Sequence, residues 1–551
     1  MKSFNKFSSF IIAPLVVGML FFSTPAQAFV EILNNTDISG SVIETGSFSQ
    51  VDGNESLSFV DEGWSLTNDF IFSARKRLKY GWQWDTNLRV RKTDDQQVDT
   101  RQDVHLLQLT TKLYNKNYEL TFGDFYTRFT NLTLNRSLEG FNFKAKWPAV
   151  GSKINFVAAR QFRGLEGVRN TRYVWGLHWD QKIAKKWFQP IPFTEKNWIK
   201  KWDIGSSIVH TFDGAGSIDT DLGVPDINNV VIGFNTDMKL FKDLNLKVEL
   251  AKTMASDKDR QVILGDLDGF DVLVRTDYKL KSKYGRSYFN LDYERTKPDF
   301  RSFSGSFVAD REAYYTQIRH VFNREYSLRA TLRTLRDNLD DDIATTTRTQ
   351  NPRVSMDIRP VKDMPDLVIR PYYDYRHIRS SNALIDVDTH LTGVEVNKKI
   401  YKGINVMLAY DLRKRTDDVG ATDETLNEYR LHVNHTFKFD HGWISPYFRM
   451  KLRNDRLDDI PSRDTFRDFQ WGVRFELMKR LRMNFNYGYN ISDRAIVDSD
   501  SIRRTWNVDA EYDILDNLMM VLSWRQFDQE FQRSVSDFEE NVGSLRLQYK
   551  Y

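Results

Sequence analysis

The sequence predicts an all-β protein that folds as one transmembrane, antiparallel, up-and-down β-barrel of about 26 strands. Three observations predict this fold class. Apolar and polar side chains alternate along most of the 551 residues, the connections are short and long in turn, and no window keeps the spacing of an amphipathic helix. Because successive side chains of a strand point to opposite faces, the alternation indicates strands with one apolar and one polar face.

The N-terminus has the features of a secretory signal peptide. Lys2 and Lys6 give the start of the chain a positive charge, and an apolar run follows over residues 7–22. Ala26-Gln27-Ala28 then forms a small-x-small cleavage pattern. We therefore expect cleavage after Ala28, with residues 1–28 removed and residues 29–551 forming a single barrel domain. An uncleaved membrane anchor is the alternative, but the run is short for a spanning helix.

Composition limits the class of protein further. Hydrophobic residues make up 40% of the chain and charged residues 28%, which suits a barrel in which only alternate strand residues meet lipid. The absence of cysteine excludes disulfides, thiolate metal sites and covalently attached haem. The formal charge of +4 falls to +2 without Lys2 and Lys6, so charge gives no argument for nucleic acid as a partner.

The stretch YGWQWDTNLRVRK, residues 80–92, shows the alternation most clearly. The parity expected to face lipid holds Trp82, Trp84, Leu88 and Val90. The parity expected to face a polar lumen holds Asp85, Asn87, Arg89 and Arg91. The same period recurs in residues 64–75, 140–147, 172–181, 229–240, 244–252, 269–280, 326–336, 367–377, 404–415, 481–492 and 543–551. Weaker patterns near 37–48, 346–358 and 387–398 leave the strand count uncertain by two.

The connections follow the topology of a membrane barrel, which has short turns at one rim and long loops at the other. Both ends of the mature chain are expected on the short-turn side. Long polar external loops are expected at 92–103, 297–312, 336–353, 415–428 and 454–465.

The signal peptide, the alternating strands, the long loops and the final stretch LRLQYKY resemble a Gram-negative outer membrane β-barrel. The resemblance implies that Tyr551 is the C-terminal aromatic residue read by the barrel assembly machinery. Size and strand count are similar to the barrel component of porin–cytochrome conduits, although the CxxC of some of those barrels is absent, and no plug domain precedes the first strand. Aromatic residues that fit the interfacial girdles are Trp147, Trp179, Trp443 and Trp506.

Charged residues on the polar parity form the candidate site, a lumen-facing wall. Cross-strand pairing of opposite charges would stiffen the wall, and a transverse field would sort passing solutes. The alternative is a solvated wall without selectivity. The wall is expected to hold Arg89, Arg91, Arg329, Arg333, Arg370, Arg376, Arg413, Arg430, Arg449, Arg453, Asp374 and Asp411.

Several segments admit two interpretations. The aromatic connection within 122–141 either folds into the lumen as a constriction or packs at the rim. Residues 181–202, rich in Lys and Trp, either lie on the inner leaflet interface or contain an uncounted strand pair.

The carboxylate-rich loops 265–271 and 337–344 are solvated external loops or, less readily, calcium sites. His432 and His435 are three apart on a strand and point to opposite faces, so no metal site is predicted.

The function predicted from these features is an outer membrane, porin-like channel that passes polar or charged solutes. The alternative is a structural sheath that encloses a partner, such as a multihaem cytochrome or an export lipoprotein. Since no catalytic or nucleotide-binding motif occurs, neither an enzyme nor a cofactor is predicted. The expected partners are outer membrane lipid, the barrel assembly machinery and, for the sheath, a periplasmic or luminal protein.

Overall fold

The computed structural model describes residues 36–551 except 59, 96–97, 100–103, 162–171, 185–197, 215–226, 242, 258–268, 341–343, 401–402, 458–462, 495–499 and 533–535. The signal peptide predicted at 1–28 lies outside the described residues. Within them, strands dominate, two 3-10 turns (Glu55–Leu57 and Lys79–Gly81) are the helical elements, and no helix is long and apolar enough to cross a bilayer.

The strands of the first half are β1 (Thr36–Gly53), β2 (Gly63–Arg77), β3 (Gln83–Thr93), β4 (His105–Tyr114), β5 (Tyr118–Arg128), β6 (Asn135–Trp147), β7 (Ser152–Gln161), β8 (Arg172–Lys182), β9 (Ile199–Asp213), β10 (Ile227–Leu240), β11 (Leu244–Asp257), β12 (Phe270–Ser282) and β13 (Gly285–Thr296). Those of the second half are β14 (Arg311–Val321), β15 (Tyr326–Asp337), β16 (Thr347–Ile358), β17 (Val368–Ser380), β18 (Asp386–Ile400), β19 (Ile404–Asp417), β20 (Thr422–Asn434), β21 (Phe437–Phe439), β22 (Gly442–Leu457), β23 (Arg463–Leu477), β24 (Leu481–Asp493), β25 (Ser501–Leu515), β26 (Leu518–Phe531) and β27 (Phe538–Lys550).

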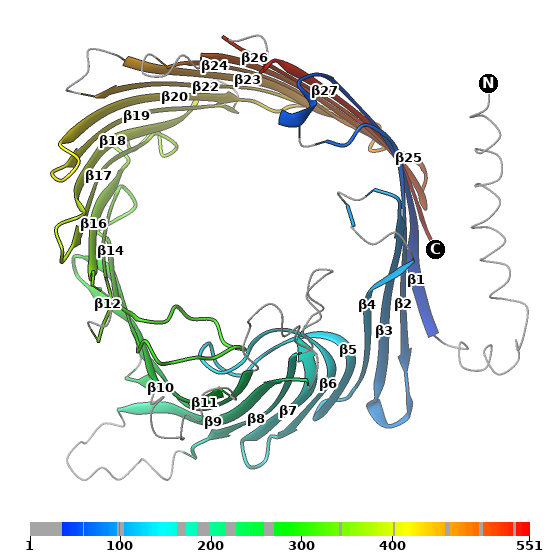
Figure 1. Ribbon diagram of the computed structural model, residues 1–551, viewed down its shortest axis with the longest axis vertical. Helices are drawn as coiled ribbons and strands as arrows, with labels where there is room; N and C mark the ends of the chain where they lie inside the picture. The colour runs from blue at the N-terminus through cyan, green and yellow to red at the C-terminus, as the bar shows by residue number, and fades with distance from the viewer. Residues whose placement is uncertain are drawn as a thin grey trace, which may run out of the picture.

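These strands form one closed antiparallel barrel, which Figure 1 shows as a ring. Of the 27 strands described, the short β21 pairs only with β22, and the other 26 each pair with their neighbours along the chain. The ring closes where β27 pairs with β1. The predicted fold class, an all-β up-and-down barrel of 26 strands, is confirmed.

The alternation of side chains gives the barrel wall two different faces. Along β8, the exposed Tyr173, Trp175 and Leu177 alternate with Val174 and Gly176. Large exposed apolar side chains recur on the same side of the sheet around the ring, and we call that side the apolar face. The opposite side is called the polar face. Because the last strand pairs with the first, no strand edge is left open. The backbone N–H and C=O groups are therefore hydrogen-bonded within the sheet, as a bilayer requires.

Two connections fold onto the polar face instead of projecting from the rim. Residues 129–134 join β5 to β6, and residues 297–310 join β13 to β14. Figure 1 shows the green trace of the second connection inside the ring, beside the cyan trace of the first. We call them the in-folded segments. The interpretation of 122–141 as a segment that enters the barrel is therefore the one the structure supports, whereas the loop expected at 297–312 is not external.

Between the in-folded segments and the polar face lies a packed core. One cluster groups Phe125, Phe129, Leu134, Leu138, Val157, Val174 and Val209. The other groups Leu132, Val231, Ala251, Leu273 and Phe300. Here the strands are apolar on both faces, which explains the continuous run Val230–Ile232 in a strand that otherwise alternates.

Three of the predicted long loops are shorter than expected. Strand β16 already begins at Thr347, inside the loop predicted at 336–353, and only residues 418–421 separate β19 from β20 where a loop at 415–428 was predicted. Likewise, only residues 458–462 separate β22 from β23. The segments near 37–48, 346–358 and 387–398 are strands. Polar sequences stay in strands past the ends of the apolar, lipid-facing stretch, because the backbone hydrogen bonds between neighbouring strands do not depend on apolar side chains.

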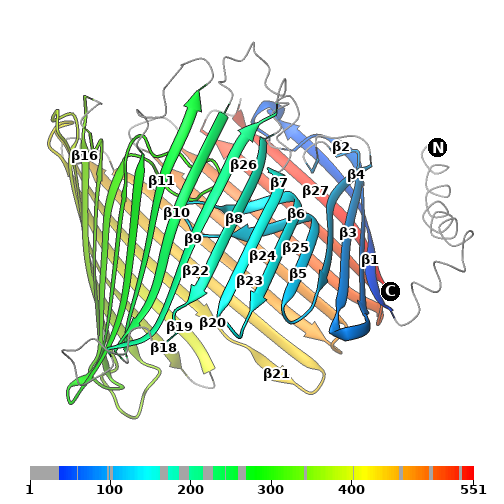
Figure 2. The ribbon, with the colours of Figure 1, turned by 90° about the horizontal axis from the view of Figure 1, so that it is seen from below.

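The chain ends, Trp443 and the connection between β8 and β9 were also the subject of predictions. Both ends of the described chain lie at the short-turn rim, as predicted, with Tyr551 beside Gly40; the turn after β2 and the β21 hairpin lie at this rim in Figure 2. Trp443 was expected in a lipid-facing girdle, but its register opposite Glu476 and its alternation with the exposed Ile444 place it on the polar face. Strands β8 and β9 pair directly, so no strand pair is inserted between them; residues 185–197 lie outside the described part.

Candidate functional site

The register aligns the predicted wall residues on the polar face of neighbouring strands. Across β15 to β22, one row of directly opposite residues runs through Arg329, Ser355, Tyr372, Gly393, Asp411, Glu428 and Arg453. Residues directly opposite on antiparallel strands share a face and stand close enough for their side chains to interact. A charged residue on one strand therefore meets its partner on the next.

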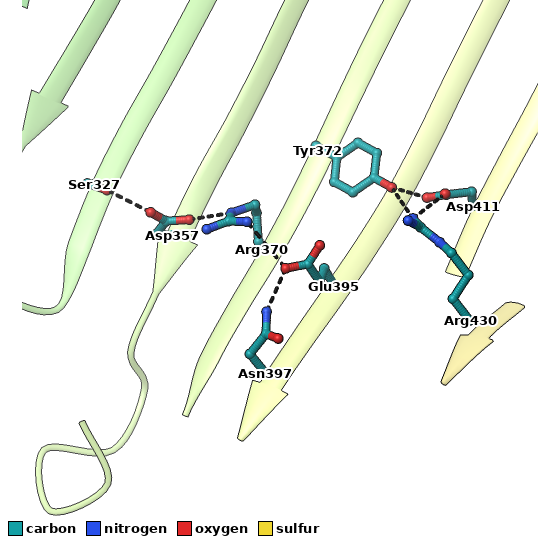
Figure 3. A network of polar contacts seen from close by, with 8 residues as sticks. All are labelled: Ser327, Asp357, Arg370, Tyr372, Glu395, Asn397, Asp411 and Arg430. Atoms are coloured by element: carbon teal, nitrogen blue, oxygen red, sulfur yellow. Dashed lines mark hydrogen bonds and ion pairs between the residues drawn. The ribbon is translucent and has the colours of Figure 1, made fainter. Parts of the chain in front are cut away.

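One network centres on Arg370 of β17, and its members, labelled in Figure 3, come from the neighbouring strands β15, β16, β17 and β18. The Arg370 Nε lies 2.6 Å from the Asp357 Oδ1 of β16, and its Nη1 lies 3.3 Å from the Glu395 Oε1 of β18. The Ser327 hydroxyl donates to Asp357, and the Asn397 amide donates to Glu395. One guanidinium thus holds two carboxylates, which fixes the side chains of adjacent strands by charge-assisted hydrogen bonds.

A second network joins Tyr372 to Asp411 and Arg430, although Tyr372 and Asp411 lie on strands that do not pair directly. Gly393 of β18 stands between them in the register, and a Cβ there would overlap both the Tyr372 ring and the Asp411 carboxylate. The absence of a side chain lets the tyrosine cross the intervening strand and donate its hydroxyl to Asp411. Arg430 Nη2 completes the network 2.6 Å from Asp411 Oδ2.

The same arrangement recurs further along the barrel. Tyr447 of β22 crosses Gly472 of β23 and donates its hydroxyl to the Asn486 Oδ1 of β24 at 3.0 Å. Sequence reasoning missed both tyrosines because it searched for charges alone. The available signal was a glycine in mid-strand, which marks a close approach by another group.

The remaining predicted wall residues have varied surroundings. Arg89 and Arg91 share Asp69, Arg413 pairs with Glu424, and Arg453 pairs with Asp455. Asp374 accepts a hydrogen bond from Asn351, and Arg449 lies over the Tyr447 ring at 5.5 Å. In the described part of the chain, four predicted residues pair with no carboxylate: Arg329, Arg333, Arg376 and Arg449.

The in-folded segments are bound to each other by backbone hydrogen bonds. The N–H of Asn135, the first residue of β6 after the first segment, donates to the Ser304 carbonyl at 2.8 Å, and the Ser306 N–H donates to the Asn131 carbonyl at 2.7 Å. Ser302 adds a hydroxyl bond to the Thr133 carbonyl. Since the two connections come from strands far apart along the chain, they hold one another against the barrel wall.

The wall provides anchors for these segments. The Asn229 amide of β10 donates to the Arg301 carbonyl at 2.9 Å, and Glu249 of β11 accepts the Asn131 N–H at 2.9 Å. A Cβ at Gly233 would overlap the Thr133 methyl group, and one at Gly176 would press on the Phe129 ring. Glycine at these positions of β8 and β10 makes room for the segments to lie against the wall.

Within the described residues, which leave out 265–268 and 341–343, neither carboxylate-rich loop forms a recognisable cation site. Asp271, at the start of β12, is buried and accepts a hydrogen bond from Thr296. Residues 258–268 lie outside the described part of the chain. Asp337 accepts the Thr347 N–H at the other loop. Among the described residues, no group of three or more His, Asp or Glu side chains is arranged to hold a metal ion.

Comparison with known proteins finds solved barrel structures of low sequence identity. No protein-family profile and no curated protein sequence matches it. The solved P pilus usher (PapC) translocation pore is 9% identical, with 94% of this chain and 99% of that one covered and a TM-score of 0.36. The siderophore receptor PirA from Pseudomonas aeruginosa is 8% identical, with coverage of 93% and 80% and a TM-score of 0.38. OccK9 (OpdG) of the same organism is 11% identical, with coverage of 68% and 98% and a TM-score of 0.32. The assignment to the barrel fold rests on the closed strand pairing described above.

Proposed function

We propose that this protein is an outer membrane channel that passes polar or charged solutes through a charged lumen lined by the polar face. One observation carries the proposal. Twenty-six strands form the closed barrel, and charged networks on the polar face of β16 to β20 line part of its interior. The apolar clusters found among the described residues lie against a different part of the wall, β5 to β12.

The size of the ring supports a wide passage. Barrels of about 16–18 strands already leave an aqueous channel, and the diameter grows roughly linearly with strand number. With a strand spacing of about 4.8 Å and a tilt of about 40°, a ring of 26 strands is roughly 50 Å across at the backbone. The in-folded segments then act as a constriction that narrows the passage from one side.

The apolar face supports placement in a membrane. Exposed Trp175, Ile232 and Leu408 stand on that face, where lipid would cover them. In this proposal the N-terminal segment 1–28 directs export, and the assembly machinery recognises the final strand through Tyr551. The wall residues act on every solute that passes, since a ring of fixed charge sets an electrostatic barrier.

Conductance across planar bilayers tests the channel. Purified barrel should give steady currents, and Arg449→Glu, which reverses an exposed charge on the polar face, should shift the reversal potential in a salt gradient towards cation selectivity. Arg480→Glu reverses a charge in a short turn outside the wall and serves as the matched control. A barrel that carries no current, or that co-purifies with a stoichiometric protein that closes it, would overturn the channel.

A further inference from the structure

Six cationic side chains gather on the polar face of four neighbouring strands, and all but Arg333 lie in the half of the strand next to the short-turn rim. We call this group the basic patch, and it consists of Lys279, Lys281, Arg286, Arg319, Arg329 and Arg333. The neighbouring residues on the opposite parity are exposed and apolar, for example Leu280 and Ile318, which fixes the face to which the patch belongs.

The register brings like charges directly together. Arg319 of β14 lies opposite Arg329 of β15, and Lys281 of β12 lies opposite Arg286 of β13. Like charges directly opposite on paired strands destabilise the sheet. A row of four residues, Lys279, Tyr288, Arg319 and Arg329, crosses the patch from β12 to β15. Folding alone would not favour this arrangement.

The patch differs from the paired arginines elsewhere on the wall, such as Arg370 and Arg430. All six side chains are exposed, and within the described residues none of them forms an ion pair or a side-chain hydrogen bond. By contrast, Arg370 contacts two carboxylates and Arg430 contacts Asp411. The nearby Asp277 accepts a hydrogen bond from the Asn290 amide and forms no ion pair with any of the six side chains within the described residues.

We propose that the basic patch binds a dissolved anion that carries two or more phosphate or carboxylate groups, and so makes the channel selective for such solutes. The inference rests on the proposed channel, whose passing solutes it specifies. Guanidinium groups form paired hydrogen bonds with phosphate and carboxylate oxygens, and lysine adds a mobile point charge. Neighbouring strands are about 4.8 Å apart, so the row from β12 to β15 extends over roughly 14 Å and can contact several anionic groups at once.

The position of the patch decides between a dissolved anion and a lipid headgroup. A headgroup would be bound on the apolar face, where Tyr278, Leu280 and Ile318 are exposed, whereas the cations stand on the opposite face of the same strands. In a channel that face meets water and the passing solute. Tyr288, in the middle of the row, offers a further polar group between Lys279 and Arg319.

Block of the current by inorganic tripolyphosphate tests the inference. In planar bilayers the wild-type channel should favour anions in a potassium chloride gradient, and micromolar to millimolar tripolyphosphate should reduce its current. In the double variant Arg319→Gln/Arg329→Gln, the half-blocking concentration should rise about tenfold or more, because two charge-assisted contacts are lost. The control Lys116→Gln/Lys362→Gln removes the same charge from two short turns outside the patch and should block like the wild type.

The outcomes separate the two proposals. A channel that conducts but shows equal block in all three proteins would overturn the anion site and leave the channel intact. A barrel without current would overturn the channel, and calorimetric titration of the same detergent-solubilised proteins with tripolyphosphate would then decide the site. Equal affinity of wild type and double variant in that titration would refute the site. Since removing a like-charge pair relieves repulsion, the double variant is expected to fold at least as well as the wild type.

Discussion

Tyr551 and Gly40 exchange two backbone hydrogen bonds, each 3.1 Å long, at the seam where the last strand meets the first. The tyrosine ring crosses Gly40, and its hydroxyl approaches the Ile71 carbonyl of β2 at 3.5 Å. A Cβ at Gly40 would overlap the Tyr551 hydroxyl and the Ile71 carbonyl. The final residue is therefore held in place by a glycine that leaves room for it.

We expect Gly40→Val to impair closure of the barrel, because the new side chain displaces Tyr551 and disturbs the pairing of β1 with β27. Heat-modifiable migration on gels and the amount of protein in the membrane fraction measure closure. Gly46→Val is the matched control, since it lies in the same strand and a Cβ there meets nothing within 4 Å. Equal assembly of both variants would show that the Tyr551 contact with Gly40 does not matter.

Leu88→Arg and Asn87→Arg test the assignment of the two faces. Leu88 lies in the middle of β3, opposite Phe72 and Leu109 on the apolar face, so an arginine there near the bilayer midplane should cost about 2–4 kcal/mol of unfolding free energy. Asn87 stands on the polar face and accepts a hydrogen bond from Ser73, whose loss should cost about 1 kcal/mol. Urea unfolding in lipid vesicles measures both costs, and similar values would contradict the assignment.

Phe300→Ala should loosen the in-folded segments. The Phe300 side chain is fully buried against Phe307 and the cluster around Val231, and truncating such a phenylalanine costs about 3–5 kcal/mol. We expect residues 297–310 to become sensitive to added protease and the single-channel conductance to rise as the constriction detaches. Val308→Ala, in the same connection but exposed, should change neither. Unchanged proteolysis of Phe300→Ala would mean that the hydrogen bonds alone hold the segment.

Tyr372 and Asp411 should be energetically coupled across the intervening strand. In a double-mutant cycle of Tyr372→Phe and Asp411→Asn, we expect an interaction free energy of about 1–3 kcal/mol, as for a hydrogen bond to a charged group. Tyr447→Phe with Asp411→Asn is the control cycle, because Tyr447 bonds to Asn486 instead, and should be additive within about 0.5 kcal/mol. Additivity in both cycles would reduce the Tyr372 contact to a geometric coincidence.

The sequence by itself determined the fold class, the order of the strands and, apart from Trp443, the faces assigned to their side chains. These depend on a local rule: alternation fixes the facing, and short turns force neighbouring segments to pair. The stretches 80–92 and 172–181 were therefore identified as strands without any knowledge of their partners. It also identified the polar parity on which Arg370, Arg430 and Asp411 stand. The lengths of the outer loops were misjudged, because a polar segment such as 422–428 stays in a strand as long as its neighbour offers ladder hydrogen bonds.

Only the tertiary structure decided which of these side chains meet. That Arg319 faces Arg329 while Arg370 faces two carboxylates depends on the register between strands, which alternation does not specify beyond its parity. Phe300 packs from the second in-folded segment onto the barrel wall. That packing depends on contacts between two connections more than 160 residues apart, such as the one between Ser302 and Thr133. Contacts at that separation are set by closure of the ring, which brings distant connections to the same interior, and no local pattern of residues encodes them.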